Sequence, residues 1–461
     1  MRRFGWLGVL LVIVLVFSAC SSGKKIGGGL TTSTSSPVSE TTSDVCKTTT
    51  LTGSEIGVTP KTITVSVIAD TGSQLRPGLF QGSVDAVQAW AKYINDKGGL
   101  ACRQVVVKAL DSKLSGDDAK NSVTTACGNS LAMVGTTALF LDNMSAAEQC
   151  KDKAGKPTGI LDMAVLQTYA AQQCSRVSFA ALPSSASCPY SPDGGVRTFK
   201  VSTVTIDYYL NKYGKDTLHG VYLVPNDLPS TISATTPQFY ADVHAGIAED
   251  AQVGISALAT QSGYTPVVQT IKNKNSTYVR DGADYVSTVF LRKEAQVQGV
   301  NKVKVWDCSL QCYDPKLIAT GGSAVENQYA WLSFLPFEDK GHNDELDSFL
   351  KYDTKPDGFG VQAWVAGEAF AAAVNAVVAK SGPNGLTRAS VLEAMKGVNN
   401  FDAGGLISPT NIGQRQGSSC LIGMQVQGGK FVRVDPVEPG KFDCKGRVIT
   451  FSIDPVKAYH G

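Results

Sequence analysis

The chain lacks the signatures of common catalytic sites. It has no G-x-S-x-G, no H-E-x-x-H, no phosphate loop ending in G-K-S/T and no G-x-G-x-x-G after a strand pattern. Gly440-Lys441 is followed by Phe442, so it does not form a phosphate loop either. We therefore expect a protein that is not an enzyme and that uses no cofactor. An enzyme whose four histidines and many carboxylates converge in space is the alternative.

An excess of either charge is also missing. The chain has 42 basic and 40 acidic residues, and the two numbers become equal without Arg2 and Arg3. Nothing in this balance favours a nucleic-acid partner. With 461 residues, 43% of them hydrophobic and 18% charged, the chain can bury a large core and form two or three domains.

The apolar run Phe4–Phe17 is too short for a membrane-spanning helix, which needs about 20 residues. It follows Arg2-Arg3 and precedes Ser18-Ala19-Cys20, an order typical of an export signal. Residues 17–20 resemble a bacterial lipobox, so we expect a signal peptide over 1–19 and lipidation of Cys20. Residues 20–61, rich in Ser, Thr and Gly, then read as a lipid-anchored flexible tether. An uncleaved membrane anchor is the alternative.

Ten further cysteines form an even set in an exported chain, which favours disulfides. No metal site is expected, because only Cys308 and Cys312 are close in sequence and no histidine lies near a second ligand pair. Sequence position alone leaves many pairings open. The pairs that we favour are Cys102–Cys127, Cys308–Cys312, Cys420–Cys444 and, more weakly, Cys150–Cys174, which leaves Cys46 and Cys188.

One βαβ unit is visible in residues 62–110. Residues 62–68 are β-branched on both faces, as in a strand covered on both sides, and the polar residues 69–74 end that strand. Apolar residues then recur at helical spacing up to Gly98-Gly99, which stop the helix, and residues 104–109 begin a second strand. The crossover predicts parallel pairing of the two strands.

The same rhythm continues along the chain. Strands are expected at 131–134, 159–161 and 178–182, and the Pro-, Gly- and Ser-rich stretch 183–197 marks a hinge. Beyond it we expect helices at 201–213 and 239–250, and strands at 218–224, 285–291 and 302–306. Residues 330–337 would return the chain to the first lobe, on which the helix expected at 363–380 would pack. After a third crossing near Phe401, antiparallel strands are expected at 420–427, 430–434 and 447–453.

The order of these elements resembles the type 1 periplasmic binding proteins of the leucine/isoleucine/valine-binding branch. The anchor runs are Thr71-Gly72, the Ile94–Gly99 helix end, Gly282-Ala283-Asp284 before a predicted strand, Pro336-Phe337, and Gly404-Gly405-Leu406 before the closing hairpin. The resemblance covers residues 62–434. It implies an α/β fold of two doubly wound parallel-sheet lobes joined by three hinge crossings, with 62–182 and 333–400 in lobe 1 and 183–332 and 401–461 in lobe 2.

Ligands of open parallel sheets bind beyond the carboxyl ends of the strands. Thr136 and Thr137 follow one strand, and in the resembled family this loop holds a ligand carboxylate; an ordinary turn is the alternative. Asp70, Thr71 and Gln74 follow another. Asp162 ends the fourth strand, where it can meet a ligand ammonium or equally cap the next helix. Asp307 ends the strand 302–306, where amino-acid-binding members of the resembled family often carry an acid; it is slightly favoured as the ammonium partner, and shaping the loop beside Cys308 is the alternative. Trp364 aligns with an aromatic residue that closes over the ligand in relatives, although core packing explains it equally well.

The second lobe departs from the resembled pattern. Asn226-Asp227 and Arg292 follow predicted strands there, but the tyrosines that amino-acid binders place at these points are missing. Arg292 can bind an anion or lie solvated at the surface. Branched-chain specificity is therefore not expected.

The hypothesis that follows is a monomeric, lipid-anchored solute-binding protein on the outer face of the cytoplasmic membrane, in the cell envelope or periplasm. It would capture an amino acid, an amide or a small organic acid in a cleft that closes by hinge motion, and deliver it to the permease subunits of an ABC transporter. A lipoprotein that signals to a sensor protein and an extracytoplasmic hydrolase are the alternatives.

Overall fold

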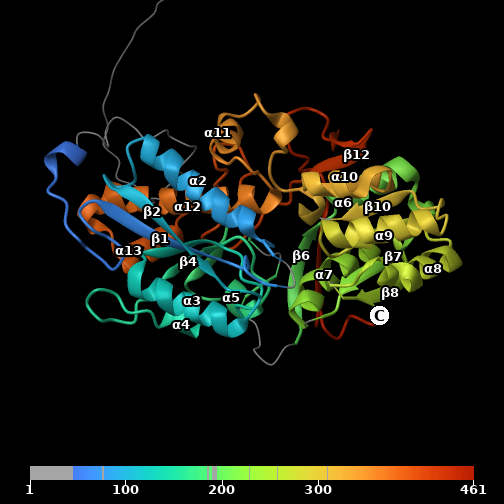
Figure 1. Cartoon of the computed structure of the whole chain (residues 1–461), viewed down its shortest axis with the longest axis horizontal. Helices are drawn as coiled ribbons and strands as arrows, with labels where there is room; N and C mark the ends of the chain where they lie inside the picture. Colours follow the sequence, from blue (N-terminus) through green and yellow to red (C-terminus); the bar gives the residue numbers. More distant parts are fainter. Residues whose placement is uncertain are drawn as a thin grey trace, which may run out of the picture. The chain divides into compact units, whose positions relative to one another are not determined.

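The computed structural model describes residues 45–461, apart from 75–76, 184–185, 189–194, 228, 257 and 309. The expected signal peptide, Cys20 and the first part of the tether lie outside the described residues. The chain forms two lobes, each built on its own sheet (Figure 1).

The first sheet has the strand order β2-β1-β3-β4-β5, and all of its pairs are parallel. Its strands are β1 (Thr62–Ala69), β2 (Gln104–Asp111), β3 (Ala132–Thr136), β4 (Leu161–Ala164) and β5 (Ser178–Ala180). The helices of this first lobe are α2 (Gln81–Asp96), α3 (Gly116–Asn129), α4 (Ser145–Glu148), α5 (Ala170–Gln173), α11 (Asp344–Tyr352), α12 (Gly358–Ser381) and α13 (Arg388–Met395). In this order β2 lies on one side of β1 and β3 on the other, so the β1–β2 and β2–β3 crossovers run in opposite directions across the sheet. Because both crossovers are right-handed, α2 and α3 lie on opposite faces of the sheet.

The second sheet has the order β13-β12-β11-β10-β9-β7-β8, in which β12 and β13 are antiparallel to their neighbours. Its strands are β7 (His219–Pro225), β8 (Ala248–Ile255), β9 (Tyr278–Asp281), β10 (Val305–Cys308), β11 (Gln328–Leu332), β12 (Ile422–Gln427) and β13 (Lys430–Asp435). The helices of this second lobe are α6 (Val204–Tyr213), α7 (Pro229–Ala245), α8 (Thr265–Lys274), α9 (Tyr285–Val297) and α10 (Pro315–Gly321). A separate antiparallel pair joins β6 (Arg197–Ser202) to β14 (Val448–Ile453), and short 3-10 helices lie at Lys215–Thr217, Gln261–Tyr264, Leu310–Cys312, Gly322–Val325, Phe337–Asp339 and Pro383–Gly385.

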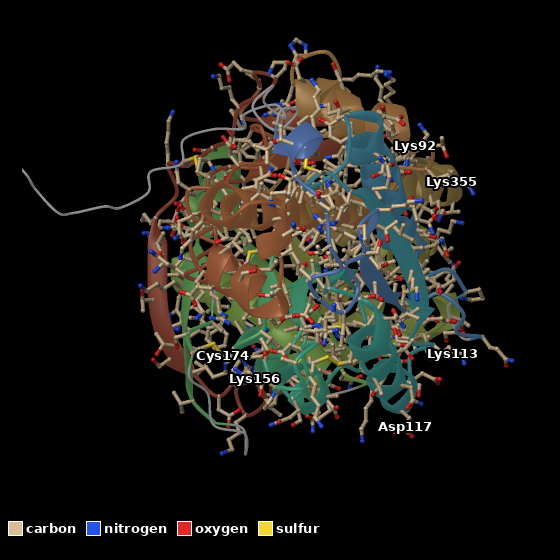
Figure 2. All side chains as sticks on the ribbon, turned by 90° about the vertical axis from the view of Figure 1, so that its left-hand side faces the viewer. Lys92, Lys113, Asp117, Lys156, Cys174 and Lys355 are labelled. Atoms are coloured by element: carbon tan, nitrogen blue, oxygen red, sulfur yellow. A yellow bond between two sulfur atoms is a disulfide. The ribbon has the colours of Figure 1, made fainter. Side chains whose placement is uncertain are left out.

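Helix α12 holds the first lobe together. It packs along α2 and against β3 and β4, and its side chains from Val361 to Ala366 are all buried. Gly367 lets the two helices approach, since a Cβ there would lie 2.5 Å from the Trp90 ring. By length and composition α12 is apolar enough to cross a membrane, but 72% of its apolar window is buried within the protein, as in the core helix of a folded domain. Charged side chains such as Lys92 and Lys113 point outward (Figure 2).

The structure confirms the first βαβ unit: β1 pairs in parallel with β2, and Gly98 and Gly99 end α2 with φ of 104° and 89°. The strand expected at 285–291 is wrong, because those residues begin α9, whose first turn is capped by the Asp284 side chain accepting the Ser287 N–H. The strands β8 and β9 were not foreseen. The predicted return segment 330–337 begins inside β11.

Residues 45–61, expected to be part of the flexible tether, lie against the first lobe. Glu55 is buried and accepts hydrogen bonds from the backbone of Lys153 and Arg388, while Thr52 N–H donates to Asn384. No sequence periodicity marks this segment, because polar contacts and the Cys46–Cys102 disulfide attach it to the first lobe.

Two of the favoured disulfides are confirmed, Cys308–Cys312 and Cys420–Cys444. The pairs Cys102–Cys127 and Cys150–Cys174 are wrong: the bonds are Cys46–Cys102, Cys127–Cys150 and Cys174–Cys188. The error follows from the tether, since Cys46 belongs to the ordered segment that lies against the first lobe. Cys127 at the end of α3 instead meets Cys150, which follows the adjacent helix α4.

Candidate functional site

The predicted loops of the first lobe meet at the carboxyl edge of its sheet. Asp70 follows β1, and its carboxylate accepts the Ser112 hydroxyl and the Leu114 N–H after β2 and the Leu139 N–H after β3, at 2.7–2.8 Å. These three bonds tie the ends of three strands together. Since Asp70 is fully buried and its oxygens are occupied, it shapes the site rather than offering a free carboxylate.

Asp111 at the end of β2 plays a similar part and was missed by the sequence analysis. Its Oδ1 accepts the N–H groups of Thr71 and Gly72 at 3.1 and 3.0 Å, and these bonds lower the pKa of a carboxyl that burial would raise. Thr71 is therefore held in place, whereas Gln74, directly before the undescribed pair 75–76, is exposed. The sequence signal that could have identified Asp111 is an acidic residue at the end of a strand, beside a Thr-Gly loop.

Thr136 ends β3 and Thr137 follows it, and both are fully buried. The Thr137 N–H donates to the Ile68 carbonyl at 2.8 Å, so the backbone donor expected for a ligand is already used. No helix begins at this loop, because α4 starts only at Ser145. The Thr137 hydroxyl, however, has no hydrogen-bond partner among the described residues. It is a buried donor at the strand end where a ligand is expected.

Asp162 does not end its strand; it is the second residue of β4. Its Oδ2 accepts the Ser178 hydroxyl at 2.7 Å and the Gln172 amide at 3.1 Å. Burial raises the pKa of this carboxyl, and the hydroxyls of Thr136 and Ser178 and the Gln172 amide only partly oppose that rise. The other carboxylate oxygen, Oδ1, is buried and has no hydrogen-bond partner among the described residues.

Asp307 lies inside β10, in the second lobe, on the face covered by α6 and α7. Its Oδ2 is 3.6 Å from Nε of Arg280 and accepts the Tyr278 hydroxyl at 3.1 Å. Arg280 also donates to both oxygens of Asp242 on α7, at 2.8 and 2.7 Å. Burial raises the pKa of Asp307 to about 6, against the lowering effect of Arg280. Asp307 is thus part of a buried ionic cluster that fastens α7 to the sheet.

Trp364 is a core residue of α12 and has no exposed surface. Its indole donates to Glu345 of α11 at 2.6 Å, and its ring packs against Tyr93 and Phe349. The described structure thus brings Asp70, Thr71, Thr136, Thr137 and Asp162 into one neighbourhood. Trp364 packs away from it, and Asp307 belongs to the other sheet.

In the second lobe, Arg292 is in α9 and not after a strand. It lies 4.4 Å from the Trp306 ring centroid and donates to the Glu326 carbonyl at 2.8 Å, and burial lowers its pKa to about 9. Asp281, which ends β9, was missed. It accepts the Ala283 N–H and the Thr288 hydroxyl, and burial raises its pKa to about 6. The run Ser276–Arg280 before Asp281, which contains β-branched and aromatic residues, was the sequence signal for this strand.

The sequence profile described as periplasmic binding protein matches residues 62–430. The chain belongs to this family. No curated protein matches it by sequence. Solved structures that share the fold include an ABC transporter substrate-binding protein of Aeropyrum pernix, with 13% identity, a TM-score of 0.66, and coverage of 86% of this chain and 98% of that one.

Two further structural neighbours of this periplasmic binding protein differ in the ligand that their names state. A leucine-binding protein of Thermotoga maritima has 15% identity, a TM-score of 0.59, and coverage of 81% of this chain and 97% of that one. A fatty acid ABC transporter substrate-binding protein of Thermomonospora curvata has 18% identity, a TM-score of 0.59, and coverage of 88% and 96%. Membership of the family supports a solute-binding role outside the cytoplasm. The fold itself does not decide the solute.

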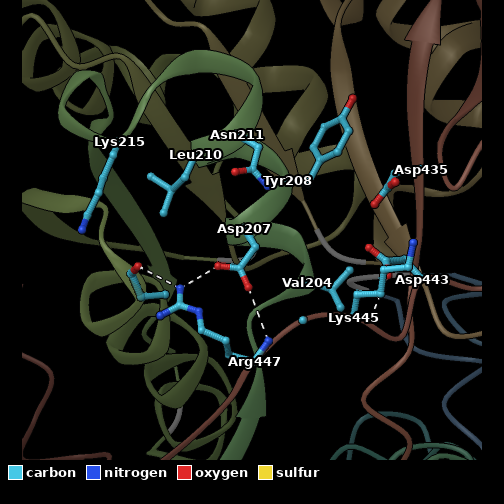
Figure 3. A pocket seen from close by; sticks show the side chains of 12 residues that line it. Val204, Asp207, Tyr208, Leu210, Asn211, Lys215, Asp435, Asp443, Lys445 and Arg447 are labelled. Atoms are coloured by element: carbon cyan, nitrogen blue, oxygen red, sulfur yellow. Dashed lines mark hydrogen bonds and ion pairs between the residues drawn. The ribbon is translucent and has the colours of Figure 1, made fainter. Parts of the chain in front are cut away.

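A surface pocket of about 600 Å³ lies away from these loops, between α6 and the chain after β13 (Figure 3). The Arg447 guanidinium donates to Asp207 at 2.6 Å in its wall. Asp435 and Asp443 face each other there, and burial together with the nearby Asp443 raises the pKa of Asp435 to about 6. None of the predicted ligand residues lines this pocket. Among the described residues, no group of three or more His, Cys, Asp or Glu side chains is placed to hold a metal ion.

Proposed function

We propose that this periplasmic binding protein captures a small polar solute between its two lobes and delivers it to an ABC transporter. The protein is exported and anchored to the membrane by a lipid on Cys20, and it works as a monomer without a cofactor and without covalent chemistry. The ligand is an amino acid, an amide or a small organic acid.

The observation that carries this proposal is the buried Thr137 hydroxyl. Thr137 has no exposed surface and its hydroxyl lacks a partner among the described residues, although buried hydroxyls are normally bonded. It lies at the carboxyl edge of a parallel sheet, where such sheets bind ligands. A ligand oxygen that accepts its proton would satisfy it.

Contacts from the second lobe support a ligand position between the lobes. The Leu310 carbonyl, which follows β10, would lie 3.5 Å from a Cβ on Gly358, the first residue of α12. Asp357, which caps that helix, would in turn be 2.1 Å from a Cβ on Gly82 at the start of α2. The loop after β10 and the carboxyl edge of the first lobe are therefore linked through the start of α12. Closure on a solute can complete a hydrogen-bond set that neither lobe supplies alone.

A thermal-shift titration tests the proposal. The panel is L-leucine, L-glutamine, acetamide, succinate and octanoate, the last because one structural neighbour is named for fatty acids. A ligand present at a hundredfold excess over its Kd should stabilise the folded protein by about 2.7 kcal/mol. Thr137→Val should remove much of this gain, since a hydrogen bond to a charged group contributes roughly 1.5–3 kcal/mol.

Thr236→Val is the matched control. Thr236 is also buried with an unpartnered hydroxyl, but it lies on α7 of the second lobe. The Thr236→Val substitution should leave the ligand-induced shift in melting temperature unchanged. Equal shifts in wild type and Thr137→Val would remove Thr137 from the site. No shift with any solute would favour a signalling or structural lipoprotein.

A further inference from the structure

The chain continues past the part that the family profile matches. After residue 430 it completes β13, is fixed by Cys420–Cys444, and forms β14, which pairs with β6. Residues 454–461, here called the closing segment, then lie against β8. His460 Nε2 is 2.7 Å from Glu249 Oε1, and the His460 N–H donates to the Gln252 side chain at 3.4 Å. The closing segment therefore lies outside the part of the chain that the family profile matches and is held by contacts with β8.

The closing segment brings Tyr459 to the carboxyl end of β7. A Cβ on Gly254, near the end of β8, would lie 2.3 Å from the Tyr459 hydroxyl oxygen and 2.2 Å from the Asn226 amide nitrogen. Asn226 is the residue directly after β7, and it is exposed. The two side chains thus share the space that the missing side chain of Gly254 leaves free.

The ring and the hydroxyl of Tyr459 have different surroundings. The ring packs against the core of the second lobe, which explains why an aromatic residue is held here. The hydroxyl is buried and has no hydrogen-bond partner among the described residues. Tyrosine hydroxyls that are buried normally find a partner, so packing leaves this polar atom unexplained.

We propose that Tyr459 is a ligand-contacting residue of this protein, acting with Asn226. The inference rests on the proposed solute-binding function and adds a residue to its site from the second lobe, at a strand end of the kind where parallel sheets bind ligands. The closing segment provides this tyrosine from outside the matched region.

The chemistry of the pair defines the ligand group. A phenol hydroxyl and a side-chain amide both donate hydrogen bonds, and neither carries a charge. Together they suit an oxygen acceptor, such as the carboxylate or carbonyl of an acid, an amide or an amino acid. The exposed Asn226 lets such a group approach, and the Tyr459 hydroxyl would be satisfied only when it arrives.

Calorimetric titration with the same panel tests Tyr459. Tyr459→Phe keeps the ring and removes the hydroxyl, so the melting temperature without ligand should not change, while the Kd for the solute that wild type binds should rise about tenfold. Asn226→Ala, an exposed change that leaves Tyr459 in place, should weaken binding likewise. Tyr352→Phe, which removes a surface hydroxyl bonded to Asp96 in the first lobe, should bind as wild type does.

The outcomes separate the two proposals. If wild type binds a solute and both Tyr459→Phe and Asn226→Ala bind it equally well, the assignment of Tyr459 is wrong and the solute-binding function stands. If wild type binds no member of the panel and a crystal structure grown with the panel shows only an ordered water on the Tyr459 hydroxyl, both proposals fail. Loss of affinity in Tyr459→Phe without a change in melting temperature supports Tyr459.

Discussion

Replacing Arg280 by Met should lower the stability of the second lobe more than replacing any charged residue on its surface. Arg280 is 8% exposed and faces two buried carboxylates, Asp242 and Asp307. Methionine fills a similar length but leaves both acids without their cation. Removing one partner of a buried ion pair typically lowers stability by about 3–5 kcal/mol, because the remaining charge stays buried.

The effect should depend on pH. Burial already raises the pKa of Asp307 to about 6, above the unfolded value of about 3.9, and Arg280 opposes that rise. Without Arg280 the pKa of Asp307 and Asp242 rises further. The folded state then binds more protons than the unfolded state above pH 3.9, so its stability falls as pH increases through this window. The deficit of Arg280→Met should therefore be smaller at pH 4.5 than at pH 7.5.

Urea titrations at both pH values measure this difference. Arg447→Met is the matched control, because the Arg447–Asp207 ion pair, at 2.6 Å, is as close as Arg280–Asp242, at 2.7 Å, but the Arg447 side chain is 59% exposed. An exposed pair of this kind contributes about 0–1 kcal/mol. If Arg280→Met is no more destabilising than Arg447→Met at pH 7.5, the buried cluster does not stabilise the lobe as argued.

Three further predictions concern other parts of the fold. Non-reducing peptide mapping should link Cys102 to Cys46, and a Cys102–Cys127 peptide would contradict the structure. Burial raises the pKa of Glu368 to about 8, so the contribution of Glu368 to stability should fall as pH rises from about 4.3 to about 8, and Glu368→Gln should remove that part of the pH dependence in thermal melts. Gly367→Ala should lower stability by about 1–3 kcal/mol by overpacking the helix interface, whereas Gly128→Ala, with open space around it, should not; equal effects would refute the close contact.

The first lobe was predictable because its signals are local. A strand covered on both faces reads as a β-branched run, and Gly98-Gly99 mark the end of α2 without reference to the rest of the chain. The second lobe was harder to read. Residues 285–291 are also β-branched and aromatic, yet the Asp284 cap and packing on the sheet make them helical, so tertiary context overrides propensity there.

The candidate site was predictable only in part, for a similar reason. The loops with Asp70 and Thr136-Thr137 follow from strand order alone, and they do meet. Whether a side chain is free to bind depends on its partners, which the sequence does not display. Asp307 looks like a strand-end acid, but Arg280, 27 residues earlier, pairs with it and with Asp242 on α7. Trp364 looks like a cleft aromatic, but Glu345 and Tyr93 hold it in the core.

Mass spectrometry of the solute released on denaturing the purified protein tests the central claim most directly. Wild type should release one small polar solute in an amount close to that of the protein, and Thr137→Val, purified in the same way, should release markedly less. Thr236→Val should match wild type. If wild type releases no solute and gains none on incubation with the panel, the protein is not the solute-binding protein proposed here.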